Sequence, residues 1–245
     1  MSELTGAEFV EELRGWRVVP DRLRHWVETR PDAPFVRCGG EWLTFAEMDR
    51  RSNALAGALA VRGVGKGDRV AVILPNCEEA LVTVFGLARL GAIQVPMNVF
   101  LKGEFLRYQL ADSQACALIA DRSGVAEAGR LSDSLPDLRL VIEVGEHDTS
   151  VDGERFADLL AENQAAAPVD ISPSDIMAIL YTSGTTGMPK GCMLSHGYYM
   201  SLTWPWYADG WYRPGDRIIT ATPMFHISGQ GIALMGALVD RKSVV

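Results

Sequence analysis

Short apolar runs alternate with helical segments along most of this chain. The apolar runs at 69–74, 92–95, 115–120 and 138–144 are separated by stretches in which apolar residues recur at helical spacing. Strands that are apolar throughout are buried on both faces, as in a parallel sheet between two layers of helices. The sequence therefore predicts an α/β fold with layered parallel-sheet subdomains and helices on both faces.

Local signals place several of these elements. A helix is expected over 21–29, and a hairpin over 35–43 around Gly39-Gly40. Thr44 followed by Glu47 has the spacing of a capping box, which predicts a helix that ends near Gly63. Asn76 is expected to cap the helix after the strand 69–74. Another helix is expected over 125–134, and Gly63 to Gly67 reads as a tight turn between a helix and a strand.

The stretch 161–174 is rich in Ala, Pro and Ser and is the predicted linker. It divides the chain into a first α/β subdomain, 1–165, and the start of a second, 166–245, which carries the glycine-rich loop described below.

Composition excludes several classes of protein. The chain has 245 residues, of which 48% are hydrophobic, enough for a sizeable core. Its net charge of −8 argues against nucleic-acid binding, which needs a basic patch. The four cysteines form no Cys-x-x-Cys pair and are expected as free thiols rather than zinc ligands or disulfides. With no secretory leader and no transmembrane segment recognisable, a cytoplasmic protein is expected.

The segment 180–191 holds the strongest functional signal. It reads Leu-Tyr-Thr-Ser-Gly-Thr-Thr-Gly-Met-Pro-Lys-Gly and directly follows the apolar run 176–180. Backbone amides, Ser and Thr hydroxyls and a lysine can together hold phosphate oxygens, so the segment predicts a polyphosphate-binding loop. It is not a Walker A loop, because Pro189 stands where the second glycine belongs.

The loop closely resembles the phosphate loop of the adenylate-forming superfamily, which includes acyl-CoA ligases. The segments 43–48, 88–98 and 222–229 also resemble elements of that superfamily, in the expected order. The resemblance implies an acid–thiol ligase of the acyl-CoA synthetase type, which uses ATP, Mg²⁺ and coenzyme A. Such an enzyme converts a carboxylic acid into an acyl-AMP and then into an acyl-CoA thioester.

The resemblance also assigns roles to residues. Lys190, Thr185 and His226 are the expected catalytic residues. The acyl pocket is expected to include Phe225, His226 and Gly229. His196 has no such context and is expected at the start of the helix after the loop. The residues expected to bind the nucleotide are Thr182, Ser183, Gly184, Thr185, Thr186, Gly187 and Lys190. Gly187 is expected to need a backbone conformation that alanine lacks.

Later elements of the superfamily are not found in this sequence. These are a Tyr-Gly-x-Thr-Glu segment, whose acid helps to hold Mg²⁺, a Tyr-x-Thr-Gly-Asp segment, and a lysine-bearing C-terminal domain. We therefore expect an N-terminal portion of a longer enzyme, with no metal ligand of its own. The isolated chain is expected to be inactive and to self-associate through exposed apolar surface.

Two other functions stay open. The chain could belong to an amino-acid or aryl-acid adenylation domain that loads a carrier protein. It could instead be a non-catalytic module that binds a nucleotide or a partner. The sequence does not indicate which acid is the substrate.

Overall fold

The computed structural model describes residues 15–145, 153–182, 187–213, 215–239 and 243–244. These residues form a seven-stranded sheet with the order β7-β6-β5-β3-β4-β8-β9 and a four-stranded sheet with the order β10-β11-β1-β2. In the larger sheet all neighbours are parallel except β8 and β9. Its strands are β3 (Arg69–Ile73), β4 (Ile93–Pro96), β5 (Ala117–Asp121), β6 (Leu140–Val144), β7 (Glu154–Arg155), β8 (Ile176–Thr182) and β9 (Lys190–Ser195). The smaller sheet contains β1 (Pro34–Val36), β2 (Leu43–Thr44), β10 (Arg217–Ile218) and β11 (Ser243–Val244).

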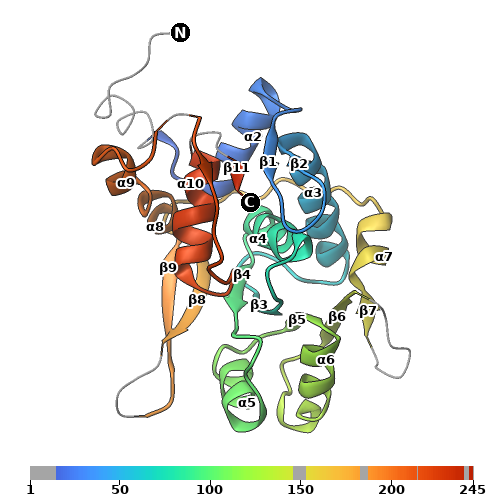
Figure 1. Cartoon of the computed structure of the whole chain (residues 1–245). Helices are drawn as coiled ribbons and strands as arrows, with labels where there is room; N and C mark the ends of the chain where they lie inside the picture. The colour runs from blue at the N-terminus through green and yellow to red at the C-terminus, as the bar shows by residue number, and fades with distance from the viewer. Residues whose placement is uncertain (1–14, 146–152, 183–186, 214, 240–242, 245) are drawn as a thin grey trace.

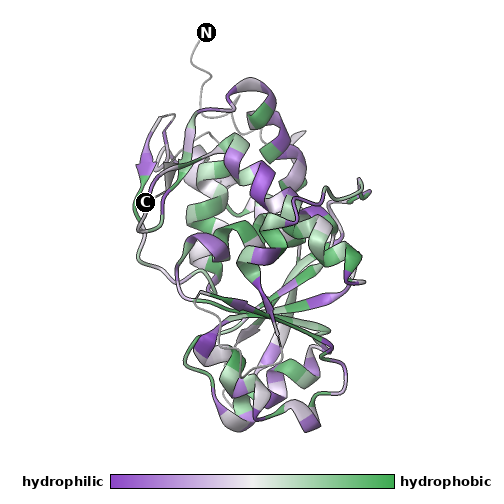
Figure 2. Cartoon of the chain, turned by 90° about the vertical axis from the view of Figure 1, so that its right-hand side faces the viewer, coloured by the Kyte–Doolittle hydropathy of each residue, from purple (hydrophilic) through white to green (hydrophobic). Residues whose placement is uncertain are grey.

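Helices cover both faces of the larger sheet, and Figure 2 shows the sheet nearly edge-on between the two helical layers. Val70 and Val72 of β3 pack into the hydrophobic core on one face, whereas Ala71 and Ile73 pack into the core on the other. The predicted α/β fold is therefore confirmed. The helices are α2 (Val19–Thr29), α3 (Phe45–Val61), α4 (Glu78–Leu90), α5 (Gly103–Asp112), α6 (Arg122–Gly129), α7 (Phe156–Ala161), α8 (His196–Ser201), α9 (Trp204–Ala208) and α10 (Met235–Val239), with a 3₁₀ turn at Ser132–Ser134 and a π-helix at Ser228–Leu234.

The strand order determines which edge of the sheet can bind a ligand. The spatial order β4-β3-β5-β6-β7 is that of a doubly wound sheet whose first strand lies between the second and the third. In such sheets ligands bind outside the carboxyl ends of the strands, where the connections diverge. Because β8 runs parallel to β4, its last residue, Thr182, lies at this same edge.

Several local predictions are confirmed. The Thr44 hydroxyl accepts a hydrogen bond from the Glu47 amide at 3.1 Å and caps α3. Gly63 and Gly67 adopt positive φ angles of 78° and 84°, a backbone conformation that favours glycine.

The prediction for residues 125–134 is wrong at both ends. The helix α6 begins directly after β5 at Arg122, because the Asp121 carboxylate accepts a hydrogen bond from the Gly124 amide at 2.8 Å. It ends at Gly129, and a separate 3₁₀ turn follows at Ser132–Ser134.

The predicted boundary at residues 165 and 166 falls between α7 and β8, in a stretch without regular secondary structure. Beyond it, β8 and β9 extend the seven-stranded sheet on the side of β4. The division into two subdomains stays a prediction. Within the described ranges, no helix is both long enough and apolar enough to cross a bilayer.

Side chains of α2 form hydrogen bonds with the end of α10. Trp26 on α2 donates its indole N–H to the Leu238 carbonyl at 2.5 Å, and Arg22 donates its Nε to the Val239 carbonyl at 2.9 Å. Both side chains are buried. In Figure 1, α2 and α10 accordingly lie side by side although they are far apart in the sequence.

His196 is the first residue of α8, as expected, and its side chain is fully buried. Neither ring nitrogen has a hydrogen-bond partner among the described residues. Burial lowers the pKa of His196 to about 4, and Lys66 adds to this effect while Asp175 opposes it. At neutral pH the imidazole is therefore uncharged.

This buried histidine predicts a loss of stability at mildly acidic pH. An unfolded histidine has a pKa near 6.5, so below that pH the unfolded chain binds a proton that the folded chain excludes. We expect the free energy of unfolding to fall by about 2 kcal/mol between pH 7 and pH 5. Urea unfolding at both pH values measures this, and a His196→Leu variant should lose most of the difference. An NMR titration that shows His196 protonated at pH 6 in the folded protein would contradict the prediction.

Candidate functional site

The predicted phosphate-binding loop connects the two strands of a β-hairpin. In the antiparallel pair β8–β9, Thr182 lies opposite Lys190 and Tyr181 lies opposite Gly191. Lys190 is thus the first residue of β9 rather than part of a loop. Thr182, Gly187 and Lys190 are exposed, whereas the predicted ligands Ser183, Gly184, Thr185 and Thr186 lie outside the described residues.

Lys190 is an available cation at the carboxyl edge of the sheet. Among the described residues, no carboxylate forms an ion pair with its ammonium group. In Figure 1 the β8–β9 hairpin projects from the sheet, beyond the end of β4. An anion that reached this turn would meet a lysine that no acid among the described residues has neutralised.

Gly187 and Gly191 differ in how much space a side chain would have at each position. At Gly191 a Cβ atom would lie 2.8 Å from Cγ2 of Ile179 and 3.3 Å from Cζ of Tyr181, so the site has room only for glycine. At Gly187 a Cβ atom would meet nothing within 4 Å, and its φ angle is not in the left-handed region. The expectation that Gly187 needs a conformation closed to alanine is therefore wrong for this structure.

The second predicted segment, 222–229, is held at the same edge by Asn76. The Asn76 side chain accepts a hydrogen bond from the Met224 amide at 2.7 Å and donates one to the Thr222 carbonyl at 3.1 Å. The prediction that Asn76 caps the following helix is therefore wrong. The N-cap position of α4 is Cys77, which makes no capping hydrogen bond through its side chain.

Gln230 fixes this segment from the other side. Its side chain is buried, donates a hydrogen bond to the Met224 carbonyl at 2.5 Å and accepts one from the Tyr199 hydroxyl at 3.1 Å. The turn at Met224 is thus held through both its amide and its carbonyl. Sequence reasoning missed both Asn76 and Gln230 in this role, because each bond joins positions that no local pattern connects.

The three predicted pocket residues occupy different environments. His226 is exposed, and its Nδ1 accepts a hydrogen bond from the Ser228 amide at 3.1 Å. Phe225 is half-buried and lines a cavity of about 10 Å³ beside Gln94, which has room for about one water molecule. Gly229 is buried in the π-helix Ser228–Leu234, a kind of turn that often occurs at functional sites.

The structure places the two predicted parts of the site along one edge without joining them. The hairpin begins with β8, whereas the segment 222–224 is hydrogen-bonded to Asn76 in the loop after β3. The strand β4 lies between β3 and β8. No hydrogen bond or ion pair connects them within the described part of the chain. A ligand in contact with both Lys190 and His226 would have to extend along the carboxyl edge of the sheet.

Metal binding is not supported by the side chains in place. Within the described ranges, no group of three or more His, Cys, Asp or Glu side chains is arranged to hold a metal ion. We therefore assign no step of chemistry to a metal at these residues. The four cysteines are free, as expected, and burial raises the pKa of Cys77 to about 12, so its thiol is protonated at neutral pH.

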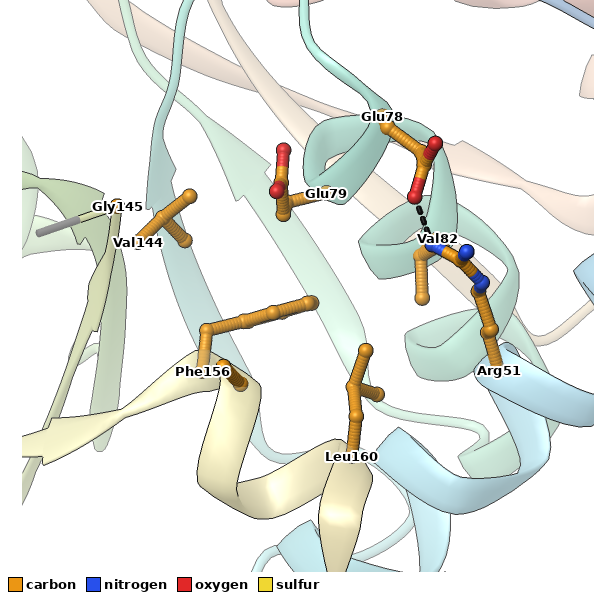
Figure 3. Close-up of a pocket in the computed structure, with 9 residues that line it drawn as sticks. Arg51, Glu78, Glu79, Val82, Val144, Gly145, Phe156 and Leu160 are labelled. Atoms are coloured by element: carbon orange, nitrogen blue, oxygen red, sulfur yellow. Dashed lines mark ion pairs between the residues drawn. The ribbon is translucent and has the colours of Figure 1, made fainter. Parts of the chain in front are cut away.

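A separate pocket of about 260 Å³ lies at the carboxyl end of β6. Figure 3 shows Arg51 paired with Glu78 at this pocket, with Glu79 beside them and the apolar side chains of Val82, Val144, Phe156 and Leu160 around it. Arg51 is also paired with Glu47 at 3.0 Å. Since acids outnumber the single arginine here, the pocket is unsuited to a triphosphate.

Comparisons with known proteins identify the family of the chain. The family of AMP-binding enzymes matches residues 23–245, which is most of the chain. The chain belongs to this family.

Its relatives include acyl-CoA ligases. A feruloyl-CoA synthase from Amycolatopsis sp is 36% identical over 223 residues, which cover 88% of this chain and 41% of that protein. A long-chain-fatty-acid–CoA ligase, FadD13 of Mycobacterium tuberculosis, is 32% identical over 92% of this chain and 42% of its own length. The chain thus spans less than half the length of these relatives.

A solved structure shows the same arrangement. The anthranilate CoA ligase AuaEII, in complex with anthranoyl-AMP, superimposes with a TM-score of 0.84 at 25% identity. The match covers 93% of this family member and 44% of the AuaEII chain.

Proposed function

We propose that this chain supplies the phosphate-binding and acid-binding edge of an enzyme that activates a carboxylic acid with ATP and then forms an acyl-CoA thioester. The observation that carries the proposal is the β8–β9 hairpin, which presents Lys190, without an ion-pair partner among the described residues, opposite Thr182 at the carboxyl edge of a doubly wound sheet. Membership of the AMP-binding enzymes and the similarity to CoA ligases support it.

In the first half-reaction a carboxylate oxygen of the acid attacks the α-phosphorus of ATP. The bond from that phosphorus to the bridging oxygen breaks, and pyrophosphate leaves with the electron pair. The protein supplies no nucleophile, so its contribution is to position the reactants and to stabilise developing negative charge. We assign Lys190 to the departing pyrophosphate, and Thr182 to Gly187, through amides and hydroxyls, to the β- and γ-phosphates.

In the second half-reaction the sulfur of coenzyme A loses its proton and forms a bond to the acyl carbon, the bond from that carbon to the phosphate oxygen breaks, and AMP leaves with the electron pair. We place the acyl group beside His226 and Phe225, in the segment that Asn76 and Gln230 hold at the same edge. The acid is proposed to be an aromatic or a long-chain carboxylic acid, since relatives are named for feruloyl, anthranilate and long-chain fatty-acid substrates.

The test is ATP–pyrophosphate exchange by the complete gene product with a panel of aromatic acids and fatty acids. We expect exchange that depends on the acid, and thioester formation when coenzyme A is added. Because the described residues lack a metal site and the relatives are more than twice as long as the matched region, we expect no exchange from the 245 residues alone. A complete gene product that binds ATP but shows no exchange with any acid would refute the proposal and favour a non-catalytic module.

A further inference from the structure

We propose that Tyr181 and Asp112 position Thr182 and Lys190, the proposed phosphate-binding residues at the ends of β8 and β9, by anchoring the hairpin to α5. Tyr181 lies in β8 directly before Thr182, and its hydroxyl donates a hydrogen bond to Oδ2 of Asp112 at 2.6 Å. Asp112 is the last residue of α5, and Tyr108 of the same helix makes an edge-to-face contact with the Tyr181 ring, with centroids 6.5 Å apart. This inference rests on the proposed function, because it assigns a role within the same site.

The anchor acts on both strands next to the turn. Tyr181 lies opposite Gly191, and the absence of a side chain there leaves room for the Tyr181 ring. Gly191 in turn directly follows Lys190. A change in the position of the Tyr181 ring is therefore transmitted to Thr182 on one strand and to Lys190 on the other.

The paired register between the hairpin and the rest of the sheet ends before this point. Between β4 and β8 the paired register is Gln94 with Ala178, so the ladder does not extend to residues 179–182. Beyond Ala178, Ile179 and Tyr181 pack against the hydrophobic core formed with α5 and α6. The bond from Tyr181 to Asp112 is thus a directional contact that holds the end of β8 on the body of the protein.

The chemistry of the bond suits a fixed anchor. A hydroxyl that donates to a carboxylate forms a short, charge-assisted hydrogen bond, stronger than one between neutral groups. Burial, together with the hydrogen bond to Asp112, raises the pKa of Tyr181, so the hydroxyl keeps its proton at physiological pH. The anchor therefore stays intact over the pH range in which a ligase is assayed.

The test compares variants of the complete gene product in pyrophosphate exchange. We expect Tyr181→Phe to lower kcat/KM for ATP about tenfold while KM for the acid changes less than about twofold. Asp112→Asn keeps an acceptor oxygen and should retain most of the activity, whereas Asp112→Leu should match Tyr181→Phe. The double variant Tyr181→Phe/Asp112→Leu should be no worse than either single one, because both remove the same bond.

Tyr198→Phe is the matched control, because Tyr198 is an exposed tyrosine on α8 whose hydroxyl makes no hydrogen bond within the described residues. Parental ATP kinetics in Tyr181→Phe would overturn the inference. So would an equal loss for ATP and acid that merely follows a lower Tm.

A second readout does not depend on catalysis. We expect the amides of Lys190 and Gly191 to exchange with deuterium faster in Tyr181→Phe than in the parent, and unchanged rates would also overturn the inference. If the parent shows no pyrophosphate exchange with any acid, the proposed function fails, and amide exchange alone decides whether the anchor exists.

Discussion

Replacing Lys190 with alanine in the complete gene product is expected to lower kcat/KM for ATP in pyrophosphate exchange by about 100-fold or more. Removing one preorganised group that stabilises developing charge typically costs about 3 kcal/mol of transition-state stabilisation. Lys190 is exposed and has no ion-pair partner among the described residues, so its removal should leave the folded structure intact. The expected signature is therefore a loss of rate without a change in Tm.

Two variants control this experiment. Lys190→Arg keeps the positive charge and should recover part of the rate, though not all, because the guanidinium differs in shape and hydration from the ammonium group. Lys102→Ala removes an exposed lysine at the start of α5 and should leave the rate unchanged. If Lys190→Ala retained the parental rate, Lys190 would have no role at the pyrophosphate.

Replacing Gly229 with alanine is expected to destabilise the fold by about 1–3 kcal/mol, the usual range for overpacking a buried site. The added Cβ would lie 2.5 Å from the Pro223 carbonyl oxygen and 3.1 Å from that of Thr222. Both are backbone atoms, and Asn76 holds the Thr222 carbonyl in place. The backbone therefore cannot yield without moving Phe225 and His226, so we also expect KM for the acid to rise.

Gly187→Ala is the matched comparison for stability. Because a Cβ at Gly187 meets nothing within 4 Å, this variant should unfold at the same urea concentration as the parent. A fall in its exchange rate would then indicate that the backbone at Gly187 approaches the phosphates closely, since folding strain is excluded. If Gly229→Ala unfolded with the same midpoint as Gly187→Ala, the packing argument for Gly229 would be wrong.

The alternation of strands and helices could be predicted because it depends on local patterns. An apolar run such as 69–74 indicates a buried strand, and the cap at Thr44 is a hydrogen bond between residues only three positions apart. The strand β9 was missed because its residues are mostly exposed and its hydrogen-bond partner is β8. The two-residue strands β7 and β10 were missed because they are too short to show any periodicity.

In the candidate site too, local patterns could be predicted from the sequence, whereas contacts between distant residues could not. Composition could single out the proposed phosphate-binding segment, since so many hydroxyls, glycines and a lysine occur together. Asn76 could not be placed correctly, because an asparagine before a helix normally caps it, and only the fold shows that its amide reaches Met224. The bond from Tyr181 to Asp112 joins residues 69 positions apart, and nothing in either segment marks them as partners.

The contacts from α2 to the end of α10 have a consequence for biosynthesis. Arg22 and Trp26 find their partner carbonyls 217 and 212 residues later in the chain. While the polypeptide emerges from the ribosome, α2 can pack against α3 and α4 as soon as they are made, but its bonds to α10 must wait until residues 238 and 239 have left the exit tunnel. Attachment of α10 to α2 is thus a late event in translation, because contacts between residues so far apart in sequence form only after both have been made.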